Sequence, residues 1–85
     1  LGSWDALHKF FSKKEGENII RGFGYVLDGE NNLIQSIDKF TAIIGLDDIV
    51  VVNTEDATLV VKKDMVERVK ELVYWLEKKD YKELI

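Results

Sequence analysis

The sequence predicts an α+β domain in which short β-strands form a sheet flanked by a short N-terminal helix and a longer C-terminal helix. Between residues 18 and 63, β-branched and aromatic residues gather in short apolar runs separated by turn-forming residues, a pattern typical of strands. Before and after this region, apolar residues recur at helical spacing. The 85 residues suffice for one core, so we expect a single domain with a helix over 1–12, strands over 18–63 and a helix over 64–79.

The first predicted helix occupies residues 4–12 of the opening segment. Ser3 can cap its free backbone N–H groups, and the negative charge of Asp5 suits the first turn. Trp4, Leu7 and Phe11 then follow at helical spacing. A polar stretch that contains a glycine ends the pattern, and the chain is expected to turn there.

Six short strands are predicted next, centred on apolar runs at 19–20, 25–27, 33–34, 40–44, 49–52 and 59–61. The connections are short and rich in Gly, Asn and Asp, which close their own turns. Such strands can form an antiparallel meander, or they can stack as rungs of an irregular β-helix. Four consecutive apolar residues at 49–52 indicate a strand that is covered on both faces.

The C-terminal helix is the element expected to cover the sheet. Asp64 and Glu67 have the spacing of a capping box, and the helix is expected to end near residue 79. Its apolar stripe is formed by Met65, Val69, Leu72 and Leu76, widened by Val66 and Val73. Tyr74 and Trp75 lie beside this stripe, so they either extend the core or are exposed.

Composition limits the classes of partner. The formal net charge is −4 and each lysine doublet adjoins an acidic residue, which argues against nucleic-acid binding. Apolar stretches are far too short for a membrane span, and the absence of cysteine excludes disulfides and permits a reducing compartment. The sequence starts at Leu1 and its only methionine is Met65, so we interpret it as a piece of a longer chain.

No catalytic, cofactor-binding or metal-binding residues are predicted. His8 has no second histidine with which to pair, and Ser3, Ser12 and Ser36 lack a convincing general base. The acidic pairs at 47–48 and 55–56 could meet to bind a cation, but the EF-hand spacing is absent and turn formation is the preferred interpretation. The sequence Gly-Phe-Gly at 22–24 is likewise interpreted as a tight turn.

Three stretches together resemble the C-terminal part of bacterial mannose-1-phosphate guanylyltransferases. They are GSWDAL over residues 2–7, AIIGLDDIVVVNTEDATLV over residues 42–60, and the terminal helix. The resemblance implies a β-helix-like tail that follows a nucleotidyltransferase domain. It also implies a parent enzyme that joins mannose 1-phosphate to the guanylyl group of GTP with Mg²⁺, releasing pyrophosphate and GDP-mannose. That family's catalytic and nucleotide-binding signatures precede the stretch matched here.

The resulting hypothesis is a noncatalytic C-terminal domain of a cytoplasmic guanylyltransferase, inactive alone and without a cofactor of its own. Its partners would be the catalytic domain of the same chain and a second copy in a homodimer, with neither nucleic acid nor membrane. Candidate domain-interface residues are Trp4, Leu7, Phe11 and Trp75. The alternative is an independent, small, acidic protein-interaction module whose exposed aromatic residues bind an unrelated partner.

Overall fold

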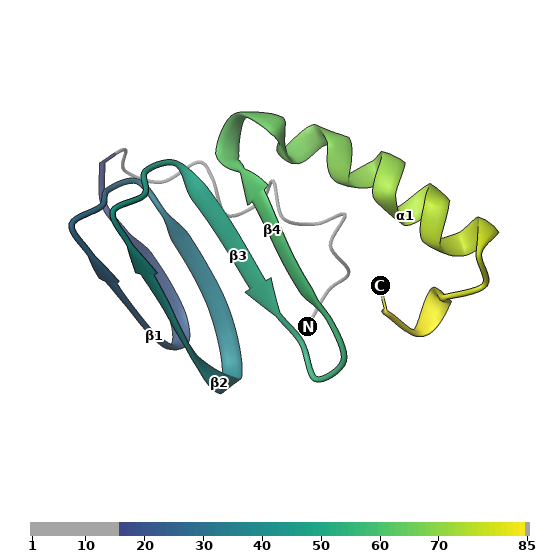
Figure 1. The fold of residues 1–85 in the computed structure, drawn as a ribbon, viewed down its shortest axis with the longest axis horizontal. Helices are drawn as coiled ribbons and strands as arrows, with labels where there is room; N and C mark the ends of the chain where they lie inside the picture. The colour runs from purple at the N-terminus through teal and green to yellow at the C-terminus, as the bar shows by residue number, and fades with distance from the viewer. Residues whose placement is uncertain (1–15, 85) are drawn as a thin grey trace.

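A computed structural model describes residues 16–84 of the chain. The predicted helix over 1–12, with Trp4, Leu7 and Phe11, lies outside these residues. A four-stranded sheet in the order β1-β2-β3-β4 precedes a helical segment (Figure 1). The strands are β1 (Ile19–Leu27), β2 (Leu33–Ile44), β3 (Ile49–Asn53) and β4 (Thr58–Lys62), and the helices are the 3₁₀-helix η2 (Lys63–Arg68), α1 (Val69–Lys78) and the 3₁₀-helix η3 (Lys82–Leu84).

The sheet is built as stacked coils that bend into two layers. Residues 19–22 pair in parallel with 33–36, and residues 24–27 pair in parallel with 41–44, with a shift of register between the two blocks. Both strands fold back in Figure 1, and Ile34 of the first block meets Ile43 of the second in one buried cluster. We call residues 19–22, 33–36, β3 and β4 the first layer, and residues 24–27 and 41–44 the second layer.

This arrangement decides between the two predicted architectures. Because β1, β2 and β3 are parallel neighbours, the coils stack as in a β-helix. Within residues 16–84, only β3 and β4 form an antiparallel hairpin. The prediction of six strands was wrong in number. The predicted runs 19–20 and 25–27 are joined in β1, and the runs 33–34 and 40–44 are joined in β2. In each case the backbone stays paired with the neighbouring coil on both sides of the bend between the two layers.

The corner of β1 requires glycine. A Cβ atom at Gly22 would lie 2.2 Å from the carbonyl oxygen of Ser36, and one at Gly24 would lie 2.7 Å from that of Thr41. Gly22 also has a φ of 111°, which L side chains rarely adopt. The tight bend predicted for residues 22–24 is therefore present as a corner between the two layers.

The turns that follow β1 and β2 are stacked copies of one another. Asp28 and Gly45 have positive φ, as do Asn31 and Asp48 at the second matching position. Across the stack, the backbone N–H of Glu30 donates to the Asp47 carboxylate and the Asn31 amide donates to Asp48, each over a separation of 17 residues. Asp47 and Asp48 are therefore turn-forming acids, as predicted.

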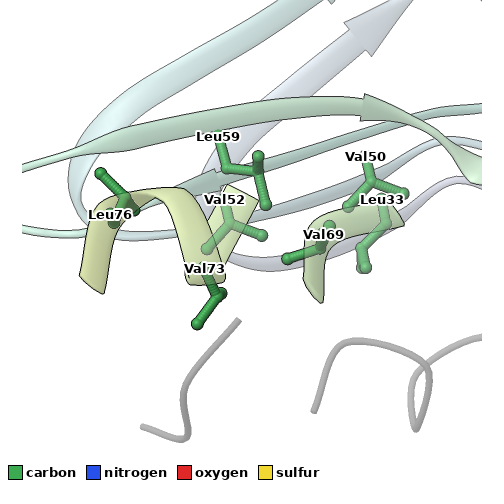
Figure 2. Packing of buried hydrophobic residues seen from close by; sticks show 7 residues of the cluster. All are labelled: Leu33, Val50, Val52, Leu59, Val69, Val73 and Leu76. Carbon is green, nitrogen blue, oxygen red and sulfur yellow. The ribbon is translucent and has the colours of Figure 1, made fainter. Parts of the chain in front are cut away.

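Helix α1 covers the outer side of the first layer. Val69, Val73 and Leu76 are its buried residues. Figure 2 shows them packed over side chains of the first layer, and the cluster consists of Leu33, Val50, Val52, Leu59, Val69, Val73 and Leu76. Val51 points the other way, into the cluster between the two layers. The prediction that residues 49–52 are covered on both faces is confirmed.

The two ends of the predicted C-terminal helix differ from expectation. Its first turns are 3₁₀, and no side-chain hydrogen bond caps them, so the predicted capping box of Asp64 and Glu67 was wrong. The chain instead enters η2 directly from β4, where the N–H of Lys63 donates to the Asp48 carbonyl at 2.8 Å. This direct entry leaves no separate capping turn. Met65, which was predicted to belong to the apolar stripe, is 39% exposed and lies outside the buried residues of the helix.

The C-terminal end of α1 closes in a Schellman arrangement. Asp80 has a φ of 66°, the N–H of Tyr81 donates to the Leu76 carbonyl, and the N–H of Asp80 donates to that of Glu77. An aspartate thus occupies the left-handed position in which glycine is usual. The helix ends at Lys78, one residue before the predicted end.

Candidate interaction surface

The outer side of the second layer is an exposed apolar face. Because side chains alternate along a strand, Val26 and Ile43 point inward and their neighbours point out. We call these outward residues, together with Phe23 and Phe40 immediately before the two segments, the second-layer face; they are Phe23, Tyr25, Leu27, Phe40, Ala42 and Ile44, and all are exposed. The six positions include no charged residue, although 33% of the chain is charged.

Register arranges this face as cross-strand pairs. Tyr25 lies beside Ala42, and Leu27 lies beside Ile44. The rings of Phe23 and Phe40 meet edge to face with 5.0 Å between their centroids, a favourable aromatic geometry. The large side chains thus form two rows, and Tyr25 stands next to the small Ala42 near the centre.

Sequence reasoning did not identify this face. It interprets the apolar runs as core-forming strands, because a run of apolar residues does not reveal which of its two sides is covered. The face could have been found by counting large apolar side chains. The segments 23–27 and 40–44 contain more of them than one helix and one inner layer can bury.

The outer side of α1 carries a second aromatic group. Tyr74 and Trp75 are 62% and 50% exposed, so the structure resolves the open question about them in favour of exposure. Lys79 lies over the Trp75 ring at 5.9 Å, and Tyr81 approaches the same ring at 6.4 Å. Trp75 thus remains accessible, as an interface residue must be, and its role stays a prediction.

A groove between β4 and the helical segment is lined by both apolar and charged side chains. Val60, Met65 and Leu72 contribute its apolar surface. At its margin, the Arg68 guanidinium donates two hydrogen bonds to the Glu71 carboxylate, at 3.0 and 3.1 Å. These bonds, together with the charge of Arg68, lower the pKa of Glu71. Because the pair is exposed to solvent, it contributes little to stability.

Among the residues that the structure describes, the candidate catalytic and metal-binding side chains are not brought together. His8, Ser3 and Ser12 lie outside those residues. The acidic pairs at 47–48 and 55–56 precede and follow β3, so the strand holds them at its opposite ends and they do not meet. Within residues 16–84, no group of three His, Cys, Asp or Glu side chains could hold a metal ion, and no helix in that range is long and apolar enough to cross a membrane.

The chain is similar to known proteins over most of its length. A mannose-1-phosphate guanylyltransferase from Klebsiella pneumoniae is 38% identical over 77 residues, covering 91% of this chain and 16% of the relative. RfbM, a mannose-1-phosphate guanylyltransferase of Salmonella typhimurium, is 36% identical over 83 residues, covering 98% and 17%. AlgA of Pseudomonas aeruginosa, an alginate biosynthesis protein, is 38% identical over 73 residues, covering 86% and 15%.

A solved structure has the same fold. The crystal structure described as mannose-1-phosphate geranyltransferase from Thermus thermophilus superimposes with a TM-score of 0.72 and 33% identity, covering 87% of this chain and 23% of that one. The chain thus spans only about a sixth of the length of its curated relatives. Residues 25–76 match the family described as the MannoseP isomerase/GMP-like beta-helix domain, so the chain belongs to that family of domains.

Proposed function

We propose that this chain is a noncatalytic C-terminal domain of a mannose-1-phosphate guanylyltransferase with a structural role. The observation that carries the proposal is the combination of a β-helix-like core, formed by two clusters of buried apolar residues, with relatives of that name that match 91–98% of the chain. The parent enzyme would convert GTP and mannose 1-phosphate into GDP-mannose and pyrophosphate in the cytoplasm.

The chemistry of that reaction is assigned to the part of the parent outside this chain. Guanylyl transfer needs a divalent cation and positive groups around the phosphoryl oxygens. The carboxylates at 47–48 are instead engaged in turn hydrogen bonds. Mg²⁺ therefore belongs to the parent enzyme in this proposal. The segment with Trp4, Leu7 and Phe11 is proposed to pack against the catalytic domain.

An assay of pyrophosphate release tests the division of labour. The 85-residue chain, the catalytic part of the parent, and their mixture are each incubated with GTP, mannose 1-phosphate and Mg²⁺. The chain alone is expected to give only background release of pyrophosphate. At elevated temperature, the mixture is expected to retain its activity longer than the catalytic part alone. Turnover by the chain alone would overturn the proposal. A catalytic part whose thermal inactivation is the same with and without the chain would also overturn it.

The exposed aromatic residues favour one alternative, an independent interaction module with no link to sugar nucleotides. The two functions differ in what the chain stabilises. A structural domain protects its own catalytic part against thermal inactivation, whereas an independent module leaves that part unchanged.

A further inference from the structure

We propose that the groove between β4 and the helical segment is the docking site of the N-terminal segment of this same chain, residues 1–15, which places Phe10 in it. We call it the β4 groove, and its apolar lining is Val60, Val61, Met65, Val69 and Leu72. The inference concerns a contact within one chain, so it does not depend on the proposed function.

The first argument is the chemistry of the β4 groove. β4 is the last strand in the order of the sheet, and beside it the groove has a volume of about 390 Å³. Val60 and Met65 are 61% and 39% exposed, so the apolar lining is incompletely covered by residues 16–84. At the margin, Arg68 and Glu71 are bonded to each other and need no charged partner. The groove therefore suits an apolar side chain.

The second argument is the position from which the N-terminal segment starts. The N–H of Gly16 donates to the Asn31 side-chain oxygen at 3.2 Å, and the Lys63 ammonium donates to the same oxygen at 2.7 Å. Lys63 begins η2 directly after Lys62, the last residue of β4. Gly16 thus lies beside the junction of β4 and η2, between which the groove is formed. Its φ of 89° is one that glycine adopts readily when a chain changes direction.

The third argument is reach. Phe10 precedes Gly16 by six residues, which span at most about 20 Å. The groove side of the helical segment, from Met65 to Leu72, extends over only about 12 Å. A short tether holds the segment near the groove at an effective concentration on the order of millimolar. The segment of the same chain therefore competes favourably with a second copy for this site.

The fourth argument is the pattern of the segment. Successive residues of an α-helix are turned by about 100°, so the helix predicted over 4–12 places Phe10 and Ala6 on one side. Trp4 and Phe11 share the adjacent side. Phe10 can therefore enter the groove, as an anchor residue of a helix does, while Trp4 and Phe11 stay available to a catalytic domain.

The first test uses the methyl group of Met65, which lines the groove and belongs to the only methionine of the chain. An aromatic ring docked against a methyl group shifts its NMR signal. In the whole chain with an isotope-labelled methionine methyl group, we expect Phe10→Ala to move the Met65 signal. Phe11→Ala, the same change at the next position, is expected to leave the signal in place. A signal that ignores Phe10→Ala, or that both variants move equally, would overturn the proposal.

The second test is disulfide trapping, which does not depend on the aromatic ring. The chain has no cysteine, so pairs can be introduced cleanly. Phe10→Cys with Met65→Cys is expected to form a disulfide within one chain at least about 10-fold faster than Phe10→Cys with Glu67→Cys. Glu67 is the matched control, because it is exposed in the same 3₁₀-helix and does not line the groove.

The concentration dependence of this oxidation identifies the occupant. A segment that docks in its own chain gives a rate that is independent of protein concentration. A rate that rises with concentration, with disulfides between two chains, would assign the groove to a second copy and contradict the proposal. Equal rates for the two cysteine pairs would contradict it as well.

Discussion

Replacing Asn32 by alanine is expected to destabilise the domain more than any other loss of a polar side chain in the stacked turns. Asn32 is 1% exposed. Its amide nitrogen donates to the Leu46 carbonyl at 2.8 Å and to the Asn18 side-chain oxygen at 3.1 Å, and its own side-chain oxygen accepts the N–H of Ile49 at 2.8 Å. One side chain thus joins three successive coils.

The magnitude follows from the groups that lose a partner. A buried polar group without a hydrogen bond costs about 1–3 kcal/mol, and alanine leaves the Ile49 N–H and the Leu46 carbonyl without the Asn32 amide. We therefore expect the free energy of unfolding to fall by about 2–4 kcal/mol. For a chain of 85 residues, whose total stability should be about 4–13 kcal/mol, this is a large share.

Urea unfolding followed by far-UV circular dichroism measures the effect, with an unchanged m-value as the sign that the folded state is preserved. Asn18→Ala is the matched control. It removes the same side chain from the same network, but Asn18 is exposed and water can replace part of its bonding, so a loss of about 1 kcal/mol is expected. A loss for Asn32→Ala no larger than that for Asn18→Ala would show that the buried Asn32 amide does not link the coils as described.

Three further changes are checked by the same unfolding measurement. Gly22→Ala should cost about 3 kcal/mol or more, because the new Cβ meets backbone at 2.2 Å, whereas Gly16→Ala, with a φ of 89° but nothing within 4 Å, should cost only about 1 kcal/mol. Val50→Ala should cost about 2–3 kcal/mol at a site with 0% exposure, and Val60→Ala, at 61%, less than about 0.5 kcal/mol; equal losses would contradict the assigned core. Asp80→Gly should raise the free energy of unfolding by about 0.5–1 kcal/mol, since glycine adopts the φ of 66° without strain; a loss of stability would be inconsistent with the Schellman arrangement.

The sequence predicted those features of the fold that depend on local chemistry. The apolar run at 49–52 indicated double coverage, and it is covered by α1 and by the second layer. The apolar spacing around Val69 and Leu76 placed the helix. Asp47 and Asp48 were identified as turn residues because aspartate favours turns; their hydrogen bonds to Glu30 and Asn31, 17 residues away, were not predicted.

The features that were missed depend on contacts between distant residues. The number of strands was overestimated because β1 stays paired with the next coil on both sides of the corner at Gly22. This pairing involves residues of another coil, so the sequence around Gly22 does not reveal it. The capping box of Asp64 and Glu67 is not formed because the helical segment already begins at Lys63, whose N–H donates to the Asp48 carbonyl of the stacked turn. The second-layer face was not found because the side of a strand that is covered depends on how many layers the fold provides.

The central claim, that this chain serves as the structural tail of a guanylyltransferase, is tested most directly by a domain replacement. The chain is substituted for the matching 77 residues of the Klebsiella pneumoniae relative, and kcat/KM for GDP-mannose formation is measured together with the temperature of half-inactivation. We expect a kcat/KM within about 3-fold of that of the unaltered enzyme, and a lower inactivation temperature when the replacement carries Val50→Asp in its core. A folded chimera without activity would contradict the structural role of the chain. A chimera whose inactivation temperature is unchanged by Val50→Asp would also contradict it.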